Sequence, residues 1–274
     1  MSGNGRALVL GGGGIAGIAW ETGVIAGLAE QGVDVLGADR IIGTSAGSTV
    51  GAQITSGVPL PDLLARQIDP ALHTPELDSG VPMEELWARF QQIAESTPDP
   101  EAQRREIGAQ ALAAETVAEA ERRAVIEARL PVHDWPERDL VVVAVDARTG
   151  EPRLFGPDDG VPLVDAVAAS CAVPAVWPCV TIGGARYMDG GIRSSTNADL
   201  AAGFERVLVL APTPEMGEPA WSGLTGAVEV IEPDEASLAA FGTNALAPSS
   251  RTPSAKAGHA QGRAIAAKVA ALWG

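Results

Sequence analysis

The stretch Ile41-Ile42-Gly43-Thr44-Ser45-Ala46-Gly47-Ser48 predicts a strand, a sharp turn and a helix in immediate succession. Two branched apolar residues lead into Gly-x-Ser-x-Gly, and the residues from Ser48 to Ile54 are small and compatible with a helix. In such a turn the small neighbours let strand and helix approach closely. The serine hydroxyl then lies above the edge of the sheet, at the N-terminus of a helix. We interpret Ser45 as a nucleophile, although Gly-x-Ser-x-Gly also occurs by chance in loops.

A second strand, turn and helix precede this stretch. Residues 7–10 (ALVL) predict a short buried strand, residues 11–17 (GGGGIAG) a turn, and the following apolar residues recur at the helical period as far as Gly32. Neighbouring parallel strands would place both turns at the carboxyl edge of one sheet. We therefore expect the N–H groups of Gly12, Gly13 and Gly14 to face the Ser45 hydroxyl as an oxyanion hole, where side chains would block the donors.

The glycine-rich turn also satisfies the dinucleotide fingerprint, as Gly12-x-Gly14-x-x-Gly17. That function further requires an acidic residue at the end of the second strand, which would bind the ribose. The second strand, residues 40–42, ends instead in Gly-Thr-Ser-Ala-Gly, and Asp34 and Asp39 precede it. The pattern therefore disfavours a nucleotide cofactor, and a turn that merely needs glycine is the remaining alternative.

The rest of the chain alternates strands and helices. Buried strands are expected at 140–145, 206–211 and 228–231, hairpin strands at 152–155, 180–182 and 186–188, and helices at 163–172 and 252–273. Neither internal repeats nor a linker divides the chain. These elements predict an α/β fold, a three-layer α/β/α sandwich with a mostly parallel central sheet, in a single domain of residues 1–274. We expect the motifs in a core of about 6–203 and a strand–helix extension over 204–274.

Residues 82–130 predict a helical insertion. An apolar stripe runs from Met83 to Ala94 and includes Trp87 and Phe90; residues 96–100 break it, and one long charged helix is expected over 101–130. Such a stripe most often packs in a core. The alternative is a helical cap that covers the serine and admits apolar substrate.

A nucleophilic serine needs a base, and two arrangements are open. His73, His133 and His259 all lack the glycine-flanked turn after a buried strand that normally holds a catalytic histidine; only His259 fits a Ser-Asp-His chain order. Asp189 follows a hairpin strand and precedes two glycines that let the chain bend towards the serine. Burial would raise the pKa of this carboxyl and make it a better base, although Asp-Gly-Gly also forms simple hairpin turns.

Composition and charge limit the kinds of molecule that we expect this protein to bind. The 274 residues include 35 acidic and 19 basic side chains, a net charge of −16 that disfavours nucleic acid and anionic bilayers and leaves at most transient membrane contact. The N-terminus lacks a signal-peptide pattern, and no run approaches the ~20 apolar residues of a membrane span. Cys171 and Cys179 indicate neither a disulfide framework nor a metal site. We expect a cytoplasmic protein, and the patterns specify no oligomeric state.

Together these motifs resemble the patatin-like phospholipase family. The segments 12–17 (GGGIAG), 43–47 (GTSAG) and 189–191 (DGG) look like its oxyanion, nucleophile and aspartate motifs; residues 169–174 (ASCAVP) and Asn197 also fit its pattern. The resemblance spans about residues 6–203. It implies a lipid acyl hydrolase in which Ser45 attacks the acyl carbonyl and Asp189 is the only base, without a metal or other cofactor.

One position departs from that family pattern. Ala16 stands where the family usually has Arg or Lys, so a cation that could attract a phosphate is missing from the loop. Neutral esters, lysolipids and thioesters are therefore as credible as phospholipids. Two alternatives also remain: a Ser-His-Asp esterase that uses His259, and a non-catalytic lipid-binding or regulatory module.

Overall fold

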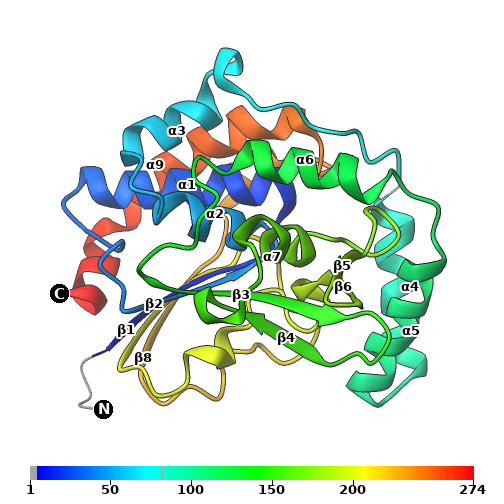
Figure 1. Ribbon diagram of the computed structural model, residues 1–274. Helices are drawn as coiled ribbons and strands as arrows, with labels where there is room; N and C mark the ends of the chain where they lie inside the picture. Colours follow the sequence, from blue (N-terminus) through cyan, green and yellow to red (C-terminus); the bar gives the residue numbers. More distant parts are fainter. Residues whose placement is uncertain (1–4, 82) are drawn as a thin grey trace.

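The computed structural model describes residues 5–81 and 83–274, which form an eight-stranded mixed sheet flanked by helices (Figure 1). The strands are β1 (Arg6–Leu10), β2 (Arg40–Thr44), β3 (Asp139–Asp146), β4 (Pro152–Phe155), β5 (Val180–Ile182), β6 (Ala185–Asp189), β7 (Arg206–Leu210) and β8 (Ala227–Ile231). The α-helices are α1 (Gly14–Glu30), α2 (Ala46–Ile54), α3 (Leu60–Ile68), α4 (Met83–Ser96), α5 (Pro100–Ala113), α6 (Glu119–Arg129), α7 (Leu163–Ser170), α8 (Glu235–Phe241) and α9 (Arg251–Trp273).

The sheet is parallel through its middle and antiparallel at one end. Strands β3, β2, β1, β7 and β8 run parallel in that order, whereas β4 and β6 are antiparallel to β3, and β5 is antiparallel to β6. One face packs against α1, α2, α7 and α9 through a large apolar cluster. The other face packs against segments that include residues 198–204 and 220–224. The predicted α/β class with a mostly parallel sheet is confirmed.

Strand β3 brings the ends of β2 and β6 together. Val142 and Val143 pair with both β2 and β4, and the next two residues pair with both β4 and β6. Because a strand has only two edges, β2 and β6 must share the edge opposite β4. Along that edge Val143 pairs with Thr44 and Ala144 pairs with Asp189. The residue after Thr44 therefore lies beside Asp189, although 144 positions of sequence separate them.

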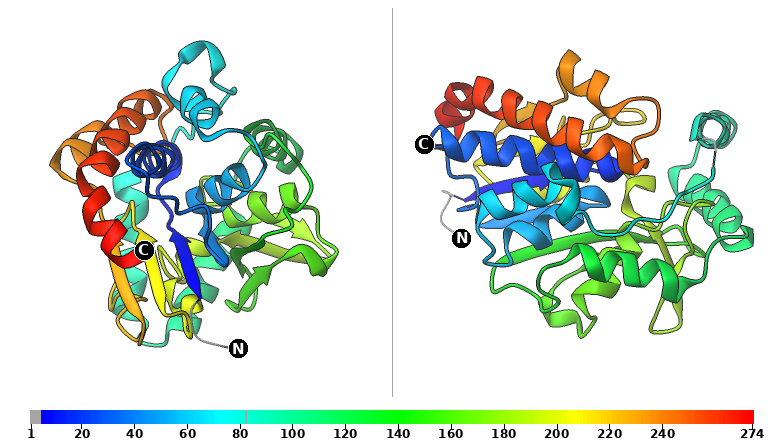
Figure 2. Two further views of the ribbon diagram at one scale, coloured as in Figure 1. Left: turned by 90° about the vertical axis from the view of Figure 1, so that its left-hand side faces the viewer. Right: turned by 90° about the horizontal axis from the view of Figure 1, so that it is seen from above.

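Helices α1 and α9 lie side by side, with their backbones almost in contact (Figure 2, right). The contact uses glycines four residues apart on each helix. A Cβ atom built on Gly23 would lie 2.4 Å from the Ala255 carbonyl oxygen, and one on Gly262 would lie 2.3 Å from that of Val24. Larger side chains would force the helices apart, so these glycines fix how α9 covers α1.

The C-terminal residues extend the sheet beyond β1. Strand β7 pairs with β1 along all five residues from Arg6 to Leu10, and β8 follows at the outside. Residues 204–274 thus supply two strands, α8 and the helix that covers α1.

The insertion contains three helices where two were expected. The break near residues 96–100 is present, but the prediction of one helix over 101–130 is wrong because the chain is extended at Ala114 and Ala118. Val117 between them packs against a buried cluster, and this contact outweighs the helix propensity of the alanine-rich sequence. Leu86, Phe90 and Ile93 of the α4 stripe are buried in the same cluster, whereas Trp87 is 46% exposed, so core packing accounts for only part of the stripe.

Candidate active site

Ser45 occupies a strained turn between β2 and α2, as the sequence predicted. It precedes the first residue of α2 and has φ 51° and ψ −113°, a backbone conformation that non-glycine residues rarely adopt. Neighbouring glycines permit the turn: a Cβ on Gly43 would lie 2.6 Å from the Ser48 Cα, and one on Gly47 would lie 2.0 Å from the Leu10 carbonyl oxygen. The hydroxyl is therefore held by a backbone that larger neighbours would not allow.

The Ser45 hydroxyl meets the Asp189 carboxylate. Ser45 Oγ donates a hydrogen bond of 2.7 Å to Asp189 Oδ2, and the Gly191 N–H donates one of 2.8 Å to Asp189 Oδ1. Ser45 is 8% exposed and Asp189 4%. Both carboxylate oxygens thus have a donor, in surroundings from which water is largely excluded.

Burial changes the acidity of this carboxyl. Loss of hydration raises the pKa of Asp189 from 3.8 to about 7, against the smaller opposing effects of the bonds from Ser45 and Gly191 and of the Arg122 charge. A carboxylate with a pKa near neutrality accepts a proton from an alcohol more readily than an ordinary aspartate does. The site therefore has a base whose strength suits neutral pH.

Ser170 links Ser45 to the sheet. The Ser45 N–H donates to Ser170 Oγ (2.8 Å), and the Ser170 hydroxyl donates to the Val143 carbonyl (2.6 Å). Val143 pairs with the last residue of β2, and the next residue of β3 pairs with the last residue of β6. This carbonyl therefore lies where β2 and β6 meet along β3. The sequence pattern marked residues 169–174 only through a family resemblance, and it gave no role for this hydroxyl.

Asn197 ties the segment after Asp189 to the end of β2. It has a left-handed backbone (φ 54°), and its Nδ2 donates to Thr44 Oγ1 (3.0 Å), the Ser194 carbonyl (2.9 Å) and the Gly190 carbonyl (3.3 Å). These bonds join the two segments that carry the serine and the aspartate. Asn197 therefore positions both without touching either hydroxyl or carboxylate.

The glycine-rich turn lies beside Ser45, but its amides are not all free. We expected the Gly12 N–H to face the hydroxyl, and this is wrong: it donates to the Ser195 carbonyl at 2.7 Å, because the chain after Asp-Gly-Gly passes next to the end of β1. Within the described chain the amides of Gly13 and Gly14 have no acceptor. The Ala46 amide, at the first position of α2, also lacks one and lines the pocket at Ser45.

All three histidines have other partners. His259 Nε2 lies 2.8 Å from a carboxylate oxygen of Glu30, where α9 crosses α1. The ring nitrogens of His73 and His133 lie near backbone carbonyl oxygens of residues 67 and 127. The Ser45 hydroxyl has its hydrogen bond to Asp189 instead. The geometry thus contradicts a triad built on His259.

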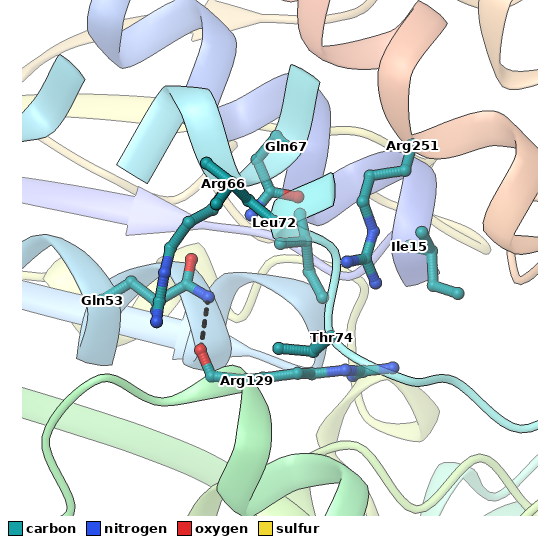
Figure 3. A pocket seen from close by; sticks show the side chains of 9 residues that line it. Ile15, Gln53, Arg66, Gln67, Leu72, Thr74, Arg129 and Arg251 are labelled. Carbon is teal, nitrogen blue, oxygen red and sulfur yellow. Dashed lines mark hydrogen bonds between the residues drawn. The ribbon is translucent and has the colours of Figure 1, made fainter. Parts of the chain in front are cut away.

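A small pocket opens at Ser45. Its lining combines apolar side chains with charged groups, from Gly14, Ile15, Ile18, Ser45, Ala46, Glu76, Leu77, Arg122, Arg129, Cys171, Val173, Trp177 and Leu246. A neighbouring pocket shares Arg129 and adds Arg251, Gln53 and Gln67 (Figure 3). The insertion reaches the Ser45 pocket through α6 and not through the α4 stripe. Sequence patterns gave no signal for these arginines, since the charged segment 119–129 resembles an exposed helix.

The family model for patatin-like phospholipases matches residues 8–202, which include Ser45, Asp189 and the glycine-rich turn. The chain belongs to the patatin-like phospholipase family. Members of this family act on lipid esters, so membership supports lipid acyl hydrolase activity in general. The match ends before β7, so it omits two strands of this sheet and the helix that covers α1.

Among solved structures, the chain is similar to VipD from Legionella pneumophila, with 16% sequence identity and a TM-score of 0.41. The alignment covers 85% of this chain and 50% of VipD, so the chain spans half the length of that protein. No curated protein matches the chain. None of the helices in the described residues combines the length and apolar character needed to span a bilayer.

Proposed function

We propose that this protein is a serine acyl hydrolase that cleaves acyl esters of lipids with Ser45 as nucleophile and Asp189 as base. The observation that carries the proposal is the 2.7 Å hydrogen bond from the Ser45 hydroxyl to a buried carboxylate at a strained turn. Family membership supports the substrate class, and the geometry supports the choice of a two-residue mechanism over a histidine triad.

In the first half of the reaction, Ser45 Oγ attacks the acyl carbonyl carbon and its proton passes to Asp189 Oδ2. The resulting tetrahedral intermediate carries a negative oxygen, and we assign its stabilisation to the amides of Gly13, Gly14 and Ala46, which have no acceptor within the described chain. Loss of one such donor typically costs about 3 kcal/mol of transition-state stabilisation. The protonated Asp189 then gives its proton to the departing alcohol oxygen, which leaves an acyl-enzyme.

The second half repeats these steps with water. Asp189 takes a proton from a water molecule, whose oxygen attacks the acyl carbon, and returns that proton to Ser45 Oγ as the ester bond breaks. The products are a carboxylic acid and the deacylated alcohol. Because Asp189 must begin ionised, the kcat/KM for an ester should fall as the pH drops below about 7.

The test compares three variants with the wild type on esters of several chain lengths. Ser45→Ala and Asp189→Asn should each abolish hydrolysis while they retain the circular dichroism spectrum, and His259→Ala should keep wild-type activity. A fluorophosphonate should label Ser45 of the wild type and fail to label the Ser45→Ala variant. Hydrolysis that survives Asp189→Asn and disappears in His259→Ala would refute the two-residue mechanism. A wild type that neither turns over nor labels would instead indicate a non-catalytic lipid-binding module.

A further inference from the structure

A buried guanidinium with unbonded donors, within the described part of the chain, lines the same pocket as Ser45. Arg122, on α6, is only 5% exposed and lines the pocket at Ser45. Its Nε and Nη1 atoms are buried and make no hydrogen bond within the described chain. A buried charged group without hydrogen bonds destabilises a protein strongly, so such a group calls for an explanation.

The contact that Arg122 does make leaves its donors free. Its guanidinium carbon lies 4.0 Å from the centroid of the Trp177 ring. Stacking on an aromatic ring uses the flat face of a guanidinium, whereas the N–H groups point outward in its plane. Trp177 can therefore hold the group in one orientation without satisfying any of its hydrogen bonds.

The neighbouring carboxylates are already engaged. Glu76 binds Arg129 through both oxygens, with Nε–Oε1 and Nη2–Oε2 distances of 3.0 and 2.6 Å, and its Oε1 also contacts Arg251. Burial raises the pKa of Glu76, but the adjacent guanidinium charges outweigh burial and hold the pKa below its ordinary value. Asp189 is bonded to Ser45 and to the Gly191 amide.

Arg122 is the charged group of this pocket whose hydrogen-bond donors are left unused within the described chain. Arg122, Arg129 and Glu76 line the pocket at Ser45, and Arg251 binds Glu76 from the neighbouring pocket. Glu76 is shared by Arg129 and Arg251, and Asp189 is bonded to Ser45 and Gly191, so Arg122 has a hydrogen bond to neither carboxylate. The unbonded Nε and Nη1 groups lie on different edges of the planar guanidinium, and each can donate to an oxygen of a phosphate or a carboxylate.

We propose that Arg122 is a specificity-determining residue that binds an anionic phosphate group on the alcohol side of the ester substrate. The inference rests on the proposed hydrolase function, because it places the phosphate in the pocket where Ser45 attacks. It narrows the substrates from acyl esters in general to acyl esters of a phosphorylated alcohol. The pocket that selects the substrate is then completed by α6 of the insertion.

The kinetic test uses two substrates that differ only in the phosphate: 1-decanoylglycerol 3-phosphate and 1-decanoylglycerol. The wild type should favour the phosphorylated ester in kcat/KM. In Arg122→Met that preference should fall about 10- to 100-fold, as expected for loss of a charged hydrogen-bonded pair. Arg122→Lys should recover part of the preference. Turnover of the neutral ester reports whether each variant keeps its active site.

Arg123→Met is the matched control, because it removes the adjacent arginine of the same helix. Arg123 is 39% exposed and pairs with Asp165 and Glu127 at the surface. Its loss should leave the preference for the phosphorylated ester unchanged. An equal loss of preference in both variants, an unchanged preference in Arg122→Met, or a wild type without preference would overturn the proposal.

A binding measurement separates this proposal from the hydrolase mechanism. Calorimetry on the Ser45→Ala variant should detect sn-glycerol 3-phosphate, and adding Arg122→Met should weaken that binding by a similar factor. Tighter binding of glycerol phosphate than of inorganic phosphate supports a head-group site, whereas equal binding overturns the head-group assignment. Absence of binding by either ligand overturns the anion site, even if esters are hydrolysed. Binding without hydrolysis by the wild type would refute only the proposed catalysis.

Discussion

Replacing Asp189 by asparagine removes a buried titrating group while it keeps the shape of the side chain. Burial raises the pKa of Asp189 from 3.8 to about 7, so at pH values between them the folded protein retains a proton that the unfolded chain releases. The stability that the neutral acid provides is therefore lost as the pH rises from about 4 through about 7. With about 1.4 kcal/mol for each pKa unit, the whole difference corresponds to about 4 kcal/mol of unfolding free energy.

The asparagine side chain can satisfy the same neighbours. Its amide oxygen can accept the Gly191 N–H, and its amide nitrogen can donate to Ser45 Oγ, whose own proton loses its acceptor and turns towards the pocket. The variant should therefore be about as stable as the wild type near pH 4. Near pH 8 it should be more stable by about 2 to 4 kcal/mol, because only the wild type must then hold a buried carboxylate.

Urea unfolding of both proteins at about pH 4, 6 and 8 measures this difference. The kcat/KM of the wild type on a neutral ester, measured over the same range, should rise with the same apparent pKa of about 7. If the stability difference and kcat/KM change with pH around the same apparent pKa, one carboxyl group is the cause of both effects. If the unfolding free energies of the wild type and Asp189→Asn differ by the same amount at every pH, the claim that burial desolvates this carboxyl is refuted. The explanation of its basicity then fails as well.

Three further substitutions test the supporting structure. Ser170→Ala removes the acceptor of the Ser45 N–H, and should lower kcat about 10- to 100-fold with a smaller change in KM, as steady-state kinetics would measure. Gly262→Val places side-chain atoms against the Val24 carbonyl and should destabilise the fold by about 3 kcal/mol in urea unfolding. Burial raises the pKa of Glu21 well above its ordinary value, against the smaller opposing effect of the Gly11 amide, so Glu21→Gln should stabilise the protein increasingly as the pH rises above about 4. Unfolding curves for Glu21→Gln that match the wild type at alkaline pH would contradict this.

The local motifs were predictable because each depends on short-range geometry. Gly-x-Ser-x-Gly after a buried strand specifies the turn at Ser45, since only small residues fit at Gly43 and Gly47. The hairpin of β5 and β6 was evident from alternating apolar residues around Gly183-Gly184. That both turns would reach one sheet edge followed from the rule for parallel strands.

The predictions failed where the structure depends on contacts between segments that are distant in the sequence. The Gly12 amide is bonded by the Ser195 carbonyl, which lies 183 positions away, so nothing local marked it as unavailable. The helix expected over 101–130 is interrupted because Val117 packs into an apolar cluster built from other elements. Arg122 occurs in a segment whose charge suggests exposure, and its burial depends on Trp177, which lies in a different part of the sequence.

The Ser45–Asp189 pair and the charged side of the pocket are built by different elements of the fold. A substitution can therefore change one of them without changing the other. The hydrogen bond between Ser45 and Asp189 follows from pairing along one edge of β3, where Thr44 and Asp189 are opposite consecutive residues. A change in the helices of residues 83–129 leaves that register intact. The charged side of the pocket, by contrast, comes from α6 and from Glu76. Changes there should therefore alter which ester is bound while the chemistry at Ser45 persists, which is why the Arg122 variants should change substrate preference without abolishing hydrolysis.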